Sequence, residues 1–203
     1  MINVSIAGIG GQGSVLAARI LAQAAEAKGW QVRSAETIGM AQRGGDVMSH
    51  VRMGNAGEEV FSPLPAKGTV NVLIALEPGE AARALPYLKE NGLLVVASTG
   101  IPPVMANFKR QTYDPQHLID DMQAAGVKMV VVDDAELVHR LGEPKALNVM
   151  MLAYAIIAVN KREDCVDNAL RGAITLEDIE AAIPLCVKRK LVSVNEKAIK
   201  VVQ

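Results

Sequence analysis

The sequence predicts an α/β fold of Rossmann-like type, a three-layer α/β/α arrangement around a mostly parallel sheet. Strand-like apolar runs alternate with helical segments along the first two thirds of the chain. A glycine-rich turn joins the first predicted strand to the first predicted helix. Half of the 203 residues are hydrophobic and only 3% are aromatic. We therefore expect one domain over residues 1–203, with an aliphatic core, an inserted β-hairpin and a helical C-terminal third.

The first predicted unit is a strand that ends in a glycine turn and continues as a helix over residues 15–28. Gly8, Gly10 and Gly13 have the G-x-G-x-x-G spacing. Glycines at such a turn permit positive φ angles, close approach to a ligand and tight packing of helix on strand. The N–H groups at the helix start suit a phosphate or a carboxylate. Because any tight strand-to-helix turn favours the same glycines, the spacing alone does not establish dinucleotide binding.

The second predicted strand, over residues 31–36, ends at Glu36, roughly where NAD-binding units place an acid that binds ribose. No second helix follows. Residues 47–53 alternate like a strand, residues 54–57 form a turn, and residues 58–62 are predicted to return as a second strand. The loop over residues 37–46 should lie at the same sheet edge as the glycine turn. Arg43 in this loop is either an anion ligand or an ordinary surface arginine.

The remaining elements follow the same pattern up to the C-terminal third, which is helical. Predicted strands cover residues 71–76, 93–97 and 128–132. Predicted helices run from Pro78 to a stop at Gly92, and from a cap at Asp114 to Gly126. In the last third, Asp134 is expected to cap a helix over residues 135–141, and Pro144 is expected to start an apolar helix that runs through residue 159. A capping box at Thr175 and Asp178 is expected before a helix over residues 176–183, and Pro184 is expected to start the last helix.

Composition and motifs exclude several functional classes. The net charge of −1 gives no electrostatic footprint for nucleic acid. Two cysteines, Cys165 and Cys186, are too few for an iron–sulfur cluster or a structural zinc site. The three histidines have no metal-ligand neighbours at suitable spacing, and no nucleophile elbow, phosphate-binding P-loop or zinc-protease motif occurs. The sequence therefore predicts no metal site, no catalytic residues of its own, no membrane span and a cytoplasmic location.

Two motifs in this order and spacing resemble the gamma-type domain of the 2-oxoacid:ferredoxin oxidoreductases. They are the G-I-G-G-Q-G turn at residues 8–13 and E-T-I-G-M-A-Q-R-G-G at residues 36–45, followed by S-H-V-R at residues 49–52. The likeness covers most of the chain, including K-A-L-N at residues 145–148. Within the family, the sequence is most similar to the beta subunits that act with indolepyruvate.

The resemblance implies a heteromeric enzyme that converts an arylpyruvate and coenzyme A into an acyl-CoA, carbon dioxide and reduced ferredoxin. Thiamine diphosphate and iron–sulfur clusters are then expected in a larger partner subunit, with none bound by this chain alone and coenzyme A at the interface. The implied binding residues are Gly10, Gly11, Gln12, Gly13, Gln42, Arg43, Gly44 and Gly45. Gln12 is expected either to fix the turn or to touch the ligand.

Two other functional classes stay open on the sequence alone. An NAD(P)-binding enzyme or redox sensor fits the glycine spacing and Glu36, but the inserted hairpin and the absence of a proton donor count against it. A structural docking subunit without ligand contacts fits the lack of a catalytic set. The isolated chain is not expected to be active under the first interpretation.

Overall fold

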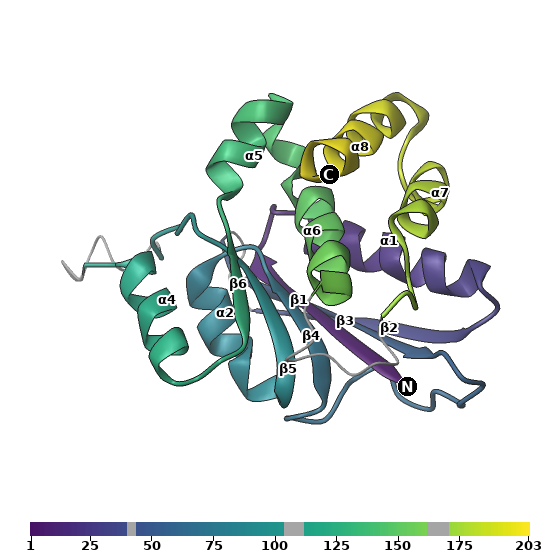
Figure 1. Cartoon of the computed structure of the whole chain (residues 1–203), viewed down its shortest axis with the longest axis horizontal. Helices are drawn as coiled ribbons and strands as arrows, with labels where there is room; N and C mark the ends of the chain where they lie inside the picture. Colours follow the sequence, from purple (N-terminus) through teal and green to yellow (C-terminus); the bar gives the residue numbers. More distant parts are fainter. Residues whose placement is uncertain (40–43, 104–111, 162–170) are drawn as a thin grey trace.

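A six-stranded sheet forms the centre of the computed structural model, which describes residues 1–39, 44–103, 112–161 and 171–203. The strand order is β2-β3-β1-β4-β5-β6 (Figure 1). The strands are β1 (Ile2–Ile9), β2 (Gln31–Ile38), β3 (Asp46–Gly54), β4 (Val70–Ala75), β5 (Leu88–Ala97) and β6 (Met129–Val132). β3 is antiparallel to both of its neighbours, and β1, β4, β5 and β6 are parallel. The predicted α/β fold with a mostly parallel sheet is confirmed.

Helices cover the two faces of the sheet unequally (Figure 1). The larger layer contains α1 (Ser14–Ala27), α5 (Asp134–Leu141), α6 (Leu147–Lys161), α7 (Leu176–Cys186) and α8 (Arg189–Val202). The smaller layer contains α2 (Pro78–Ala84) and α4 (Pro115–Ala124). Short 3-10 turns, η1 (Leu85–Tyr87) and η2 (Pro144–Ala146), precede β5 and α6. The helical C-terminal third predicted from the sequence thus belongs to the larger layer.

Alternation along β1 divides the core into two parts. Ile2, Val4 and Ile6 point into the larger layer, where they meet α1 and α6. Ala7 points to the opposite face and joins the smaller core beneath α2. Successive strand residues face opposite sides of a sheet, which places these side chains in separate clusters. The apolar run predicted as a buried helix is α6, and most of its side chains are buried.

The predicted return strand over residues 58–62 is wrong. Both edges of β3 are already paired, with β1 on one side and β2 on the other, so no edge is left for a further strand. The hairpin is instead made by β2 and β3, whose connection spans residues 39–45. The segment after β3 is held by side chains: the amide oxygen of Gln31 accepts from the N–H of Val60, and Nη1 of Arg52 donates to the carbonyl of Ser62 at 2.8 Å.

Two predicted helix boundaries are also wrong. The helix from Pro78 ends at Ala84, because Pro86 cannot continue an α-helix, and Gly92 lies inside β5 near an irregular pairing with β4. Pro184 lies within the last turn of α7, and the final helix begins only at Arg189.

The predicted caps are confirmed at two sites and shifted at one. Asp114 accepts from the N–H of His117 at 3.1 Å, and Thr175 forms the full capping box with Asp178. Gly29 follows α1 with a φ of 76°. The cap of α5 is Asp133 rather than Asp134, since the carboxylate of Asp133 accepts from the N–H of Glu136 at 3.0 Å.

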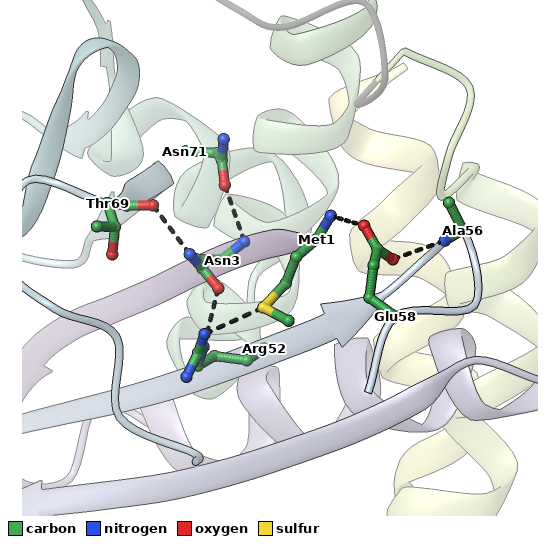
Figure 2. Close-up of polar contacts among 7 residues, drawn as sticks. All are labelled: Met1, Asn3, Arg52, Ala56, Glu58, Thr69 and Asn71. Carbon is green, nitrogen blue, oxygen red and sulfur yellow. Dashed lines mark hydrogen bonds and ion pairs between the residues drawn. The ribbon is translucent and has the colours of Figure 1, made fainter. Parts of the chain in front are cut away.

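A network of side chains ties the strands together where β1 and β4 begin (Figure 2). We call it the polar clasp, and it consists of Met1, Asn3, Arg52, Glu58 and Asn71. The Nε of Arg52 donates to the amide oxygen of Asn3 at 3.1 Å, and the side-chain amide of Asn71 accepts from the backbone N–H of Asn3 at 2.9 Å. The carboxylate of Glu58 pairs with the N-terminal ammonium and accepts from the N–H of Ala56 at 2.9 Å. The clasp joins β1, β3, β4 and the segment after β3.

Candidate functional site

The glycine turn at the carboxyl end of β1 adopts backbone conformations that favour glycine. Gly11 has a φ of 106° and Gly13 a φ of 85°, both in the left-handed region. A Cβ on Gly13 would lie 2.8 Å from Nδ2 of Asn148, whereas a Cβ on Gly11 would meet no atom within 4 Å. The turn is therefore packed against α6 at Gly13 and open at Gly11.

The start of α1 has no side-chain cap among the described residues. Gly13 is its N-cap residue, and the first turn contains no acidic side chain. The first N–H groups of a helix lack partners within the helix and carry a partial positive charge. A helix start without a capping side-chain oxygen favours an anion, so the anion site expected from the sequence stays a prediction that this geometry fits.

Gln12 links the turn to the neighbouring strand. Its Oε1 accepts from the N–H of Ile9 at 2.6 Å, and its Nε2 donates to the carbonyl of Leu76 at 2.8 Å. Asn148 makes a comparable link from α6, because its Nδ2 donates to the carbonyl of Gly13 at 3.0 Å. These contacts are those expected of a residue that fixes the turn, the first of the two roles that the sequence left open for Gln12.

The second glycine segment lies directly against the turn. The N–H of Gly10 donates to the carbonyl of Gly45 at 2.9 Å, and the N–H of Gly39 donates to the carbonyl of Asp46 at 2.8 Å. Gly44 has a φ of 70°. Gln42 and Arg43 lie outside the described residues. The predicted proximity of the two glycine segments is thus observed for Gly10 and Gly45. We call the edge formed by Gly10–Gly13 and Gly44–Gly45 the glycine rim.

A buried acid next to the rim was not singled out by the sequence. Glu77 caps α2 through the N–H of Glu80 at 2.9 Å, accepts from the N–H of Ile101 at 3.2 Å, and accepts from the hydroxyl of Tyr113. Burial, followed by the contact with Glu77, raises the pKa of Tyr113. The Tyr113 hydroxyl therefore stays protonated and anchors the segment before α4. The position of Glu77 directly before Pro78 is the signal that predicts a cap.

Glu36 does not occupy the position that ribose recognition requires. In the Rossmann arrangement the second strand pairs with the first, whereas here β3 separates β1 from β2. Adjacent strands are about 4.8 Å apart, so the insertion moves Glu36 about one further strand spacing from the glycine turn. Its side chain lines a groove with Val15 and Arg19 on the outer side of α1. This geometry removes the main support for an NAD-binding site.

The histidines have surroundings typical of structural residues. His50 is buried, its Nδ1 lies 2.8 Å from Oγ of Ser5, and burial lowers its pKa. His117 is exposed and lies 3.6 Å from the carboxylate of Asp121. Across the described ranges, no three side chains of His, Cys, Asp or Glu are grouped so that they could hold a metal ion. In the same part of the chain, no helix is long and apolar enough to cross a bilayer.

Comparison with known proteins identifies the family. The model of the family "Pyruvate ferredoxin/flavodoxin oxidoreductase" matches residues 3–203. The chain belongs to this family. The indolepyruvate oxidoreductase subunit IorB of Archaeoglobus fulgidus is 32% identical over 200 residues, which cover 98% of this chain and 92% of that protein.

Solved structures agree with the fold of this family member. The gamma subunit of a keto/oxoacid ferredoxin oxidoreductase from Geobacter sulfurreducens has a TM-score of 0.66 at 23% identity and covers 99% of this chain and 95% of its own. A 2-oxoglutarate:ferredoxin oxidoreductase from Magnetococcus marinus, solved with 2-oxoglutarate, coenzyme A and succinyl-CoA bound, has a TM-score of 0.68 at 15% identity. The match covers 98% of this chain but only 30% of the Magnetococcus chain. The same fold therefore occurs as a separate small chain and within a much larger one.

Proposed function

We propose that this oxidoreductase-family chain is the small subunit of a heteromeric 2-oxoacid:ferredoxin oxidoreductase that acts on indolepyruvate or another arylpyruvate. The observation that carries the proposal is the match to an indolepyruvate oxidoreductase subunit over nearly the full length of both chains. The reaction consumes the 2-oxoacid and coenzyme A, and yields an acyl-CoA, carbon dioxide and two electrons carried by ferredoxin. The larger subunit supplies thiamine diphosphate and the iron–sulfur clusters. We place the complex in the cytoplasm.

The described residues fit a role beside an active centre rather than as the centre itself. No metal-ligand group occurs among them, and the histidines have structural surroundings. The glycine rim, by contrast, combines an uncapped helix start with an open backbone at Gly11. We therefore assign binding, not bond-making, to this chain.

The rim suits the anionic groups of coenzyme A or of the 2-oxoacid. The N–H groups at the start of α1 favour a phosphate or a carboxylate. A side chain at Gly11 would stand in the open space beside them, so glycine keeps that space available. In this proposal, Gly10 to Gly13 and Gly44–Gly45 form the backbone cradle and Gln12 holds its shape. Gln42 and Arg43, which lie outside the described residues, are proposed to bind the anion through their side chains.

The test is the assembled enzyme, made by co-expressing this chain with its larger subunit. We expect the pair to co-purify and to reduce an electron-accepting dye in the presence of indolepyruvate and coenzyme A. Replacement of Arg43 by alanine should raise the Michaelis constant for coenzyme A or for the 2-oxoacid about tenfold or more, since it removes a charge-assisted hydrogen bond.

The matched control is Arg189→Ala, which removes an exposed arginine at the start of α8. This variant should keep both Michaelis constants. If Arg43→Ala also keeps both constants while the complex stays intact, the ligand-binding role is wrong and the chain is a docking subunit only. If the pair does not assemble, or the isolated chain turns over an arylpyruvate alone, the proposed function fails.

A further inference from the structure

Beside the glycine rim, part of the sheet is not covered by α2 and α4, the described helices of the smaller layer. α2 packs on β1, β4 and β5, whereas helix packing against β2 and β3 comes from α1 on the opposite face. Figure 1 places α2 and α4 together toward the β4–β6 side of that layer. A cavity of about 180 Å³ lies beside α2, next to the part of the sheet that α2 covers. It lies between α2, η1 and the exposed face of β2 and β3.

The walls of this cavity combine apolar and acidic groups. Ala7, Met48 and the ring of Tyr87 supply apolar surface, and the buried ring of His50 lies 5.7 Å from the Tyr87 ring. Two carboxylates line the cavity: Glu80, whose side chain is 8% exposed, and Asp46, which is exposed at the start of β3. This is the lining expected for a long side chain with an apolar stem and a cationic end.

Among the described residues that line the cavity, acidic side chains outnumber basic ones. Nη1 of Arg83 lies 3.1 Å from Oε1 of Glu80, but the Arg83 side chain is 60% exposed and reaches Glu80 from the solvent side. Two carboxylates, those of Glu80 and Asp46, face this one guanidinium among the described lining residues, and burial lowers the pKa of His50, which disfavours a positive charge on its ring. Burial also raises the pKa of Glu80; Arg83 opposes this shift, while Asp46 and Glu77 add to it. A second cation would relieve the repulsion among these acids.

We infer that this cavity receives a lysine or arginine side chain of the larger partner subunit when the complex assembles. The inference rests on the proposed function, because that function supplies the partner. The cation would lie between Glu80 and Asp46, with its methylene stem against Met48 and Tyr87, where an aromatic face adds a cation–π contact. The cavity adjoins the glycine rim through Asp46, so one docking event would cover both.

The experiment measures the affinity of this chain for its larger subunit by biolayer interferometry at low and high salt. Glu80→Gln keeps the shape of the side chain and removes its charge, and should weaken binding about thirtyfold or more. Asp46→Asn removes an exposed charge and should weaken binding only about twofold to fivefold. Both effects should shrink as salt is raised. The control Glu136→Gln removes an exposed carboxylate on α5, in the opposite helical layer, and should leave binding unchanged.

A second variant tests the same site without altering a buried group. Thr37 is exposed on β2 and lines the cavity, so Thr37→Arg would place a guanidinium of this chain where the partner's cation belongs. It should weaken assembly at least as much as Glu80→Gln, with no loss in melting temperature. The inference is overturned if Thr37→Arg, or a correctly folded Glu80→Gln chain, binds as tightly as the wild type. Failure of the wild-type pair to bind at all would instead overturn the proposed function.

Discussion

Side chains link the strands where β1 and β4 begin, whereas two glycine segments meet through their backbone at the carboxyl end of β1. In the polar clasp, Arg52 donates to the side chain of Asn3, and Glu58 pairs with the N-terminal ammonium and accepts from the N–H of Ala56 (Figure 2). At the glycine rim, Gly10 bonds Gly45 through backbone alone, and no described side chain caps α1. The clasp satisfies its own donors and acceptors, so it serves stability. The start of α1 at the rim has no side-chain cap among the described residues, which is why we propose binding as the role of the rim.

The largest effect is expected for Gly13→Ala, which tests how the backbone of the glycine rim is packed. The substitution forces a side chain into left-handed backbone and brings its Cβ to 2.8 Å from Nδ2 of Asn148. We expect a loss of about 2–4 kcal/mol in the free energy of unfolding, from backbone strain and overpacking together. Urea unfolding of the purified chain measures this loss.

Gly29→Ala is the matched control for Gly13→Ala. Gly29 has a φ of 76° and no atom within 4 Å of an added Cβ, so only the backbone strain applies. Its expected cost is about 1–2 kcal/mol. Equal losses for the two variants would mean that packing of the turn against α6 contributes nothing.

Gln12→Ala tests whether a side chain that stabilises the rim also shapes its function. It removes two hydrogen bonds, to Ile9 and to Leu76, and should cost about 1–3 kcal/mol in unfolding free energy. Because the turn loses its link to β4, kcat/KM for coenzyme A in the assembled enzyme should fall as well. Gln123→Ala on the exposed side of α4 should change neither quantity. If the Gln12→Ala enzyme kept its kcat/KM, the hydrogen bonds by which Gln12 holds the turn would not be needed for the function of the rim.

Arg52→Ala makes the corresponding change in the polar clasp. The side chain donates to Asn3 at 3.1 Å and to the carbonyl of Ser62 at 2.8 Å, so its loss should cost about 1–2 kcal/mol of stability. Steady-state kinetics of the assembled enzyme should nevertheless match the wild type. A raised Michaelis constant in Arg52→Ala would contradict the division of roles between the two ends.

Glu58→Gln is expected to have the smallest effect, and it depends on pH. The hydrogen bond from the N-terminal ammonium, followed by that from Ala56, lowers the pKa of Glu58 to about 2. A carboxylate with a lowered folded-state pKa stabilises the fold above its unfolded pKa and loses that contribution as pH falls through the folded pKa. The melting temperature of Glu58→Gln should therefore lie slightly below that of the wild type at neutral pH, and the two should converge by about pH 2. A difference that persists unchanged in acid would contradict this.

The elements that periodicity predicts are mostly present, but periodicity does not say which strands pair. Residues 47–53 alternate as a strand should, and β3 covers them; nothing in the alternation shows that β3 lies between β1 and β2. The return strand was inferred from a local hairpin rule, which fails because both edges of β3 are taken, one by β2 directly before it in the chain and one by the more distant β1. Pairing between distant segments is a tertiary property that a short window of sequence does not contain.

The site was predictable to the extent that it depends on glycine. The spacing of Gly10, Gly13 and Gly45 indicated a shared edge, and the bond between Gly10 and Gly45 is observed. Asn148 was named only as part of a motif, and Glu77 was not named, because each acts through a backbone group far away in the chain. A polar residue at the start of an otherwise apolar helix is the one local signal that points to Asn148.

The central position of β3 also determines when the first unit can form during synthesis. β1, α1 and β2 leave the ribosome first, yet β1 and β2 have no edge in common until β3 joins them. A nascent chain that stops before residue 46 therefore lacks the strand on which both of its predecessors depend. Local pairing of β2 with β3 comes early because their connection is short, whereas closure onto β1 brings together residues as far apart as Ile2 and Met53. Translation must deliver a little over a quarter of the polypeptide before its amino-terminal strand can gain its first partner, β3, and β4 on its other edge follows later still.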